Sequence, residues 1–469
     1  MEDIKKRDGF GSSIGALLAM LGSALGVGNI IKFPALVGEN GGAAFILVYI
    51  ICLLVSGFPI MVAEIFIGRK AHKNNVDAYT EAGGRKSWGA LGWLGTFAAM
   101  LLLAYYTLFA SWVMRYAYTT MTGQLNGITD VGVAKTLFSN FNGSAEPFFW
   151  QVGFLLLAGI VLSFGVKKGI ERVVKILMPL LIVILIIAVV RGALLPEAGS
   201  ALKFLLSPDF SKITSAVVVT ALGLSFFKLS LGIGSMVIYG SYSDGQTKIM
   251  STAAKIIIID LVVSVLAGFA VFSGFFSGNG SGLPLAGFDL LFESLPVLFS
   301  NVFLGQHVMF LFFFLTGIVA FTAAISILEV PIAVISEKTR LGRLSTVWIV
   351  IAVIMIVGSI PSLGNSLFSY FGDSTLVMRI GDIEKSGITN IFDYIVSNIF
   401  MPLIGMFTAI LVAYKMDEKT VINELSNFGS INNIKAIKIY RWILKLTPFV
   451  LFFIFLKVSG ILSLLGITI

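Results

Sequence analysis

Long apolar stretches alternate with short polar stretches along most of this chain. Each apolar stretch carries few charges and has about the ~20 residues that a helix needs to cross the hydrocarbon of a membrane. Residues 277–300 are more amphipathic and predict a re-entrant or capping loop instead. The pattern predicts eleven membrane-spanning helices, at residues 12–37, 42–68, 88–122, 148–166, 170–192, 213–241, 248–276, 303–337, 344–360, 390–415 and 440–463.

The first predicted span is interrupted by glycine. Residues 18–34 read LAMLGSALGVGNIIKFP, in which Gly22, Gly26 and Gly28 lie close together. Glycine is a poor helix former, so this segment favours an unwound backbone. Within a membrane, unwound backbone is tolerated only where it lines a cavity or is buried by protein. The segment therefore indicates a binding site, with close packing of helices through small residues as the alternative.

The sixth span repeats this feature. Residues 225–235 read SFFKLSLGIGS, and Gly232 and Gly234 echo the glycines of the first span. Five spans separate the two copies, and because five is odd the second copy enters from the opposite side of the membrane. Two interrupted helices at matching places in inverted halves predict a site near the middle of the bilayer.

Composition and charge support a membrane protein and give its orientation. Of 469 residues, 57% are hydrophobic and 12% are charged, which excludes an ordinary soluble domain. The net charge of +8 reflects topology: the segments expected inside hold 22 Lys and Arg, and those expected outside hold 6. The N-terminus is therefore expected in the cytoplasm and the C-terminus outside. No nucleic-acid partner and no cleavable signal peptide are expected, and Cys52 is expected to be inert.

Several long motifs, in order, resemble the neurotransmitter:sodium symporter family. The motifs are GSALGVGNIIKFP, ENGGAAF and GFPIMVAEIFIGR for the first two helices, and LLAYYTLFASW, KKGIERVVKILMP, FFKLSLGIG and FTAAISILEVPIA for helices three, five, six and eight. The similarity begins near Arg7 and reaches the eleventh span. Eleven spans instead of twelve resemble the short bacterial branch of the family.

The resemblance implies an all-α polytopic membrane protein with the leucine-transporter fold, in the bacterial inner membrane. That fold has a 5+5 inverted repeat with broken helices 1 and 6, plus an eleventh helix. The expected parts are a cytoplasmic N-terminal gate segment at 1–11, the first repeat at 12–192, the second repeat at 213–415, and a cytoplasmic loop with the last helix at 416–469.

The resemblance also implies a substrate site at the two helix breaks. The amides of Val27 and Gly28, with the Tyr106 hydroxyl, would hold the substrate carboxylate. Amine transporters of the family carry Asp where Gly26 stands, so the resemblance favours an amino acid. The substrate amine would lie among the carbonyls of Ala24, Phe227 and Ser230. The side-chain pocket would be apolar and formed by Leu102, Tyr106, Phe227, Ile233, Ala324 and Ile327; ordinary helix packing is the alternative for these positions.

Two gates follow from the same resemblance. Lys32 and Asp393 match an outer pair that closes over the substrate, with Tyr106 and Phe227 as its inner lid. The family usually has Arg at the position of Lys32, and Lys offers a point charge in place of a planar fork. On the cytoplasmic side, the inner gate would consist of Arg7, Glu337 and Tyr242.

The chain departs from the family at the first sodium site. That site uses the Ala24 carbonyl, the Asn29 side chain, a Thr or Ser on helix six, and an Asn on helix seven. Here the helix-six position is Lys228, and the alignment places the helix-seven position near Thr252. We expect the Lys228 ammonium to replace sodium and pair with the substrate carboxylate. The alternative is a structural lysine paired with Asp260 or Glu64.

The second sodium site is also expected to be weaker. It would use the carbonyls of Gly22, Leu25 and Val319 and the hydroxyl of Thr322, but Ala323 lacks the second hydroxyl. Loss of one oxygen ligand does not abolish the site. Nothing in the sequence supports a chloride site.

These observations predict a secondary active transporter that imports a hydrophobic or aromatic amino acid by alternating access. Three kinds of coupling stay open: one sodium ion at the second site, protons through Lys228, or exchange without an ion. A non-transporting sensor that retains the pocket is the alternative. An enzyme is not expected, since His72 and His307 lie near opposite faces. The expected partners are the amino acid and membrane lipids, with no cofactor beyond sodium, and the sequence leaves monomer and homodimer open.

Overall fold

The computed structural model describes residues 9–277, 290–300, 304–373, 375–380 and 383–459. The predicted gate residue Arg7 therefore lies outside the described residues. Within the described part, nine helices are long and apolar enough to cross a membrane, and one bent pair makes a tenth.

The uninterrupted spans follow the apolar stretches of the sequence closely. Their helices are α3 (Ala43–Cys52) and α4 (Phe58–Ala71), α6 (Gly89–Met121), α8 (Glu146–Ser163), α9 (Arg172–Ala193), α13 (Ile249–Ser277), α15 (Gly305–Lys338), α16 (Arg343–Ser362), α17 (Ile388–Tyr394) and α18 (Met401–Ile410), and α20 (Ile434–Val458). Wider π-helical turns join or extend several of them, at Leu53–Gly57, Val166–Glu171, Ile395–Phe400 and Leu411–Lys415.

Both predicted interruptions are present. The first span consists of α1 (Ser13–Ala24), a π-helical turn at Gly28–Lys32 and α2 (Phe33–Glu39), with a bend of 51°. The sixth consists of α11 (Ser215–Lys228) and α12 (Ser235–Ser241). Gly232 and Gly234 between them have φ of +77° and +88°, a region that glycine adopts without steric cost.

Short elements connect the long helices. They are α5 (Asn75–Gly83), α7 (Val131–Asn142), α10 (Ala198–Leu206), α14 (Leu295–Ser300), α19 (Glu418–Leu425), and single 3-10 turns at Lys86–Trp88, Phe210–Lys212 and Ser369–Phe371. Of the predicted re-entrant segment, the described part is a π-helical turn at Leu290–Ser294 followed by α14. An antiparallel hairpin of β1 (Val377–Ile380) and β2 (Ile383–Ser386) also forms, which the helical prediction did not include.

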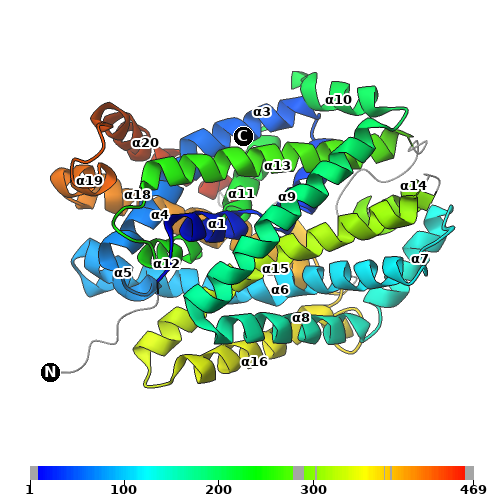
Figure 1. The fold of residues 1–469 in the computed structure, drawn as a ribbon, viewed down its shortest axis with the longest axis horizontal. Helices are drawn as coiled ribbons and strands as arrows, with labels where there is room; N and C mark the ends of the chain where they lie inside the picture. Colours follow the sequence, from blue (N-terminus) through cyan, green and yellow to red (C-terminus); the bar gives the residue numbers. More distant parts are fainter. Residues whose placement is uncertain (1–8, 278–289, 301–303, 374, 381–382, 460–469) are drawn as a thin grey trace.

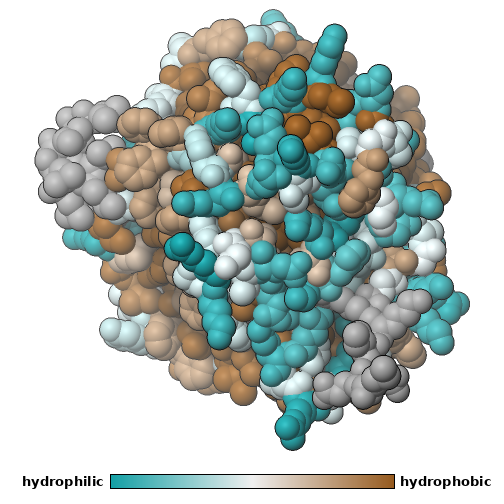
Figure 2. All heavy atoms as spheres, turned by 90° about the vertical axis from the view of Figure 1, so that its left-hand side faces the viewer, coloured by the Kyte–Doolittle hydropathy of each residue, from teal (hydrophilic) through white to brown (hydrophobic). Residues whose placement is uncertain are grey.

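The arrangement places the interrupted helices inside the bundle. Figure 1 shows α1 near the middle of the bundle among the long α9, α13 and α15, and α12 to its left beside α4 and α5. Large apolar side chains such as Phe149, Ile356 and Phe453 are exposed on the outer helices, as expected for surfaces that face lipid. Figure 2 shows the end of the bundle near the N-terminus, where hydrophilic residues gather across the face and hydrophobic residues surround them.

Candidate functional site

The break in the first helix lies directly against α6. The Val27 amide donates a hydrogen bond to the Tyr106 hydroxyl over 3.3 Å. A Cβ atom added at Gly26 would lie 3.4 Å from the same hydroxyl. The Gly26 amide donates to the Asn29 side-chain oxygen over 3.0 Å, which fixes the turn after α1. An amide, a hydroxyl and a position without a side chain therefore converge where a carboxylate is expected.

The sixth-helix break approaches this place from the other side. A Cβ atom at Gly28 would lie 2.8 Å from Cγ of Lys228 and 3.1 Å from the Phe227 ring, so only glycine fits there. Ser230, with φ of +51°, donates to the carbonyl of Ser23 over 2.9 Å. The two breaks thus touch each other through backbone and short side chains.

The residues expected to line the apolar pocket are all buried. None is more than 7% exposed: Leu102, Tyr106, Phe227, Ile233, Ala324 and Ile327. Burial suits a closed pocket and also suits helix packing, so the contacts of Tyr106 and Phe227 with the first break are the more specific observation.

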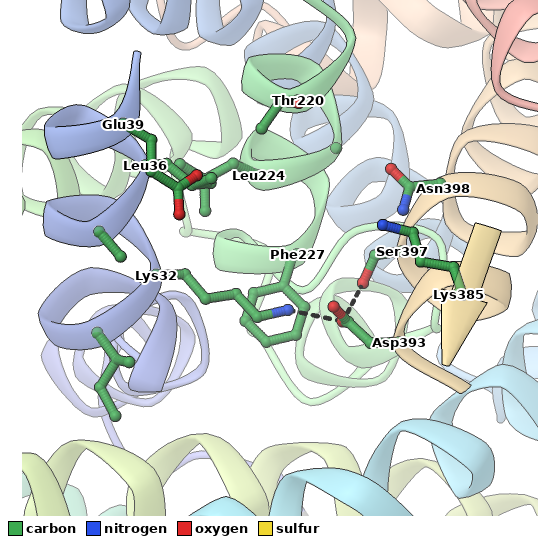
Figure 3. A pocket seen from close by; sticks show the side chains of 13 residues that line it. Lys32, Leu36, Glu39, Thr220, Leu224, Phe227, Lys385, Asp393, Ser397 and Asn398 are labelled. Atoms are coloured by element: carbon green, nitrogen blue, oxygen red, sulfur yellow. Dashed lines mark hydrogen bonds and ion pairs between the residues drawn. The ribbon is translucent and has the colours of Figure 1, made fainter. Parts of the chain in front are cut away.

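Lys32 and Asp393, the predicted outer gate, form a salt bridge, and we name it the outer pair. Nζ of Lys32 lies 2.6 Å from Oδ1 of Asp393 and 3.8 Å from the centre of the Phe227 ring. Asp393 also accepts hydrogen bonds of 2.9 Å each from Tyr105 and Ser397. Figure 3 shows Lys32 and Asp393 pointing toward one another beside Phe227. A cavity of about 370 Å³ adjoins the pair, with Lys385 of β2 in its wall.

Tyr242 and Arg343 both bond Glu329, and we name these three residues the inner cluster. Tyr242 donates to Oε1 of Glu329 over 2.7 Å, and the Arg343 guanidinium donates to both oxygens of Glu329 over 2.9 and 2.7 Å. Glu337 instead accepts from the backbone and side-chain amides of Asn74 at 3.1 and 3.0 Å. The predicted inner set therefore omitted Glu329 and Arg343.

The N-terminal segment packs against the inner cluster. The Phe10 amide donates to the Tyr242 carbonyl over 3.0 Å, and the Phe10 ring meets the Tyr239 ring edge-on at 5.5 Å. Glu171 accepts from the Gly11 amide at 2.6 Å and from the Ser12 hydroxyl at 2.9 Å. The N-terminal segment is thus fixed to Tyr242 of the inner cluster and to Glu171 at the turn before α9.

At the expected first sodium site, the structure contains a buried ion pair. Nζ of Lys228 lies 3.0 Å from Oδ2 of Asp260 and 2.6 Å from the Ser264 hydroxyl, and neither charged side chain is exposed. The Asn29 side-chain nitrogen donates to Oδ1 of Asp260 over 2.6 Å and to Ser264 over 2.9 Å. Tyr49 donates to Oδ2 of Asp260 over 3.3 Å.

This geometry corrects the predicted helix-seven position. Asp260 and Ser264, not Thr252, are the residues of α13 that meet Asn29 and Lys228. Thr252 lies eight residues earlier, which is about 12 Å along a helix. An acid within an apolar span is itself a signal, because an intramembrane charge needs a partner. The predicted position was wrong because the family has an asparagine there, whereas this chain has an aspartate.

At the expected second sodium site, the described residues carry no charged side chain. A Cβ atom at Gly22 would lie 3.3 Å from Cβ of Thr322, and the Thr322 hydroxyl donates to the Val319 carbonyl at 3.1 Å. The helical ladder of α1 stops at Leu25, whose amide bonds Leu21. Ala323 presents a methyl group toward Gly26. The predicted ligands Gly22 of α1 and Thr322 of α15 therefore lie against each other.

A further ion pair lies outside the membrane spans, between α5 and the end of α15. Asp77 pairs with Lys338 and accepts from Asn74. Partial burial raises the pKa of Asp77, but the hydrogen bonds from Lys338 and Asn74 outweigh it and hold that pKa below its ordinary value.

Comparisons with known proteins agree with this arrangement. The model of the sodium:neurotransmitter symporter family matches residues 7–129 and 140–464. An uncharacterized sodium-dependent transporter of Bacillus subtilis is 33% identical over 96% of this chain and 98% of its own. Another of Haemophilus influenzae is 34% identical over 88% and 91%. The crystal structure of MhsT in complex with L-phenylalanine superimposes with a TM-score of 0.86 at 33% identity, covering 96% of this chain and 100% of the other.

Proposed function

Because the chain belongs to the sodium:neurotransmitter symporter family and has its leucine-transporter fold, we propose that it is a secondary active transporter for a hydrophobic or aromatic amino acid. It works by alternating access in the bacterial inner membrane, with the N-terminus in the cytoplasm and the C-terminus outside. The outer pair opens to admit the substrate, and the inner cluster opens to release it.

The observation that carries the proposal is the place where Val27, Gly26 and Tyr106 meet. The Val27 and Gly28 amides and the Tyr106 hydroxyl bind the substrate carboxylate, as backbone amides at a helix break do for anions. Gly26 leaves room for that carboxylate. The carbonyls of Ala24, Phe227 and Ser230 hold the amine, and the apolar lining selects an aliphatic or aromatic side chain. The similar structure of MhsT holds L-phenylalanine, which supports this substrate class.

Sodium supplies the coupling at one site. The bacterial relatives are named sodium-dependent transporters, which favours sodium over protons or ion-free exchange. The ion would be held at the second site by the carbonyls of Gly22, Leu25 and Val319 and the hydroxyl of Thr322. Lys228 supplies the positive charge of the first site.

A screen of the twenty amino acids tests the proposal. Thermal shifts of the purified protein in sodium chloride should be largest for apolar zwitterions such as L-leucine and L-phenylalanine. The matched variant Gly26→Asp fills the carboxylate position and should remove these shifts. A response only to acidic amino acids or to amines without a carboxylate would contradict the site.

Uptake separates a transporter from a sensor. Proteoliposomes with an inward sodium gradient should accumulate the amino acid that gives the largest thermal shift. Binding without uptake, under either direction of the gradient, would favour a sensor that retains the pocket.

A further inference from the structure

The ion pair between Lys228 and Asp260 belongs to a hydrogen-bond network that joins the first span, α11 and α13. Ser264 donates its hydrogen to the Asp260 carbonyl over 2.6 Å, so its lone pairs accept from Lys228 and Asn29. The Lys228 ammonium also lies 4.7 Å from the centres of the Phe33 and Tyr49 rings, where the ring faces stabilise a cation. One positive and one negative charge therefore balance inside the bundle.

This network does not fit a sodium ion. The Asn29 oxygen, which the family offers to sodium, accepts from the Gly26 amide at 3.0 Å. Its nitrogen faces the Asp260 carboxylate, because at 2.6 Å a carboxylate oxygen requires a donor. A second cation would also lie directly beside the ammonium, and like charges at contact distance repel strongly when they are buried.

The ammonium still has one donor to give. A protonated lysine carries three N–H groups, and Asp260 and Ser264 take two of them. The lysine stem lies against Gly28, since its Cγ is 2.8 Å from a Cβ built on that glycine. Gly28 also carries one of the two amides that we propose for the substrate carboxylate, so the lysine side chain adjoins that proposed position.

We propose that the Lys228 ammonium is the fixed cation of the first site and that Asp260 positions it, so the substrate carboxylate binds with no sodium ion there. This inference rests on the proposed amino-acid site. It joins the two alternatives that the sequence left open, because the lysine is both paired with Asp260 and available to substrate. Transport is then coupled to one sodium ion, at the second site.

Other charged groups on the neighbouring elements have separate roles in the structure. Lys32 on the first helix pairs with Asp393, Lys175 on α9 pairs with Glu171, and Glu64 on α4 accepts from the Gly232 amide at 2.7 Å. The counter-charge of Lys228 thus comes from Asp260.

The sodium dependence of substrate binding tests the proposal on the full chain. Binding of L-phenylalanine and L-leucine is measured while sodium replaces choline at constant ionic strength. The unmutated protein should give a Hill coefficient for sodium of about one. A coefficient near two would overturn the inference and leave the proposed function intact, whereas no binding of any of the twenty amino acids would overturn both.

A rebuilt neutral site gives the second test. Lys228→Thr with Asp260→Asn replaces both charges by oxygen-bearing side chains, so the Hill coefficient should rise toward two. Lys255→Met removes an exposed lysine of α13, the helix that carries Asp260, and should leave the Hill coefficient unchanged. An unchanged coefficient in a folded double variant would contradict the proposal.

A third variant separates positioning from folding. Lys228→Met with Asp260→Leu removes both charges together, so neither is left buried and unpaired. The affinity for L-phenylalanine in saturating sodium should fall at least tenfold while the melting temperature changes little. Asp260→Glu keeps the counter-charge and should retain most of the affinity. If Lys228→Met with Asp260→Leu binds L-phenylalanine as tightly as the unmutated protein does, the pair has only a structural role.

Discussion

The outer pair and the inner cluster, which we propose as the two gates, differ in how firmly each carboxylate is held. In the outer pair, one lysine from the first helix meets one carboxylate, and the two side chains are 17% and 30% exposed. In the inner cluster, Glu329 is completely buried and accepts two bonds from the Arg343 guanidinium and one from Tyr242. A planar fork holds a carboxylate more firmly and with more defined geometry than an ammonium does.

The bonds also cross different boundaries. Three side chains donate to Asp393. Ser397 lies one helical turn away on the same segment, Tyr105 lies on α6, and Lys32 alone comes from the first helix. The inner cluster joins α12, α15 and α16, and the N-terminal segment is attached to it through Phe10. This difference indicates that the outer end opens at a lower free-energy cost.

The largest effect is expected when the inner cluster is broken. Arg343→Ala leaves Glu329 buried without its cation, and removal of one partner of a buried pair costs about 3–5 kcal/mol. Hydrogen exchange at the Phe10 amide, which bonds Tyr242, should accelerate strongly. Arg343→Lys, which loses only the fork, should show a smaller change. If the Phe10 amide exchanges as slowly in Arg343→Ala as in the unmutated protein, Arg343 does not hold the inner cluster together.

Asp393→Ala should have the next largest effect. Lys32, Tyr105 and Ser397 lose their common acceptor, so the outer end no longer closes over the substrate. Uptake into proteoliposomes should fall by at least tenfold, while expression and size-exclusion behaviour stay near those of the unmutated protein. If folding and insertion fall as much as uptake, the pair has only a structural role.

Lys32→Arg should act in the opposite direction and more weakly. The guanidinium can form two parallel bonds with Asp393, which makes the outer closure resemble the inner one. Dissociation of a bound amino acid toward the outer side should slow by a few fold in stopped-flow measurements. Faster dissociation would show that the short lysine fits this site better than the fork.

The smallest effect is expected for Asp77→Asn, at the partly exposed pair with Lys338. Such pairs contribute about 0.2–1 kcal/mol. Because the pKa of Asp77 is lowered, its contribution is present above the unfolded pKa and is lost only as the pH falls through the lower folded pKa. The difference in melting temperature between variant and unmutated protein should therefore stay constant from pH 8 to pH 5.

Sequence and structure agree best where one residue type has one physical consequence. The glycines of the first and sixth spans predicted two interrupted helices, and both interruptions are present. The similarity of the motifs also pointed to Lys32 and Asp393, which lie 361 residues apart and meet at 2.6 Å. The roles of these residues in transport stay predictions.

The prediction was less complete where a partner had to be identified. Lys228 was recognised as an unusual charge, but the choice between Asp260 and Glu64 was open, and the helix-seven position was predicted near Thr252, eight residues before Asp260. Glu329, an acid within an apolar span, was itself a signal, but it was missed together with Arg343 because the two lie on different helices. The hairpin at residues 377–386 was missed because its strands are only four residues long.

The sequence by itself determined the membrane class, the helix boundaries to within a few residues and the location of both helix breaks. These properties depend on local hydrophobicity and on the backbone freedom of glycine. Both are set by residues that are adjacent in the sequence. Only the tertiary structure decided that Lys228 pairs with Asp260 and that Glu329 takes Arg343. Ion pairing depends on a few ångströms between side chains from different helices, and the rotation and depth of each helix in the bundle set those distances.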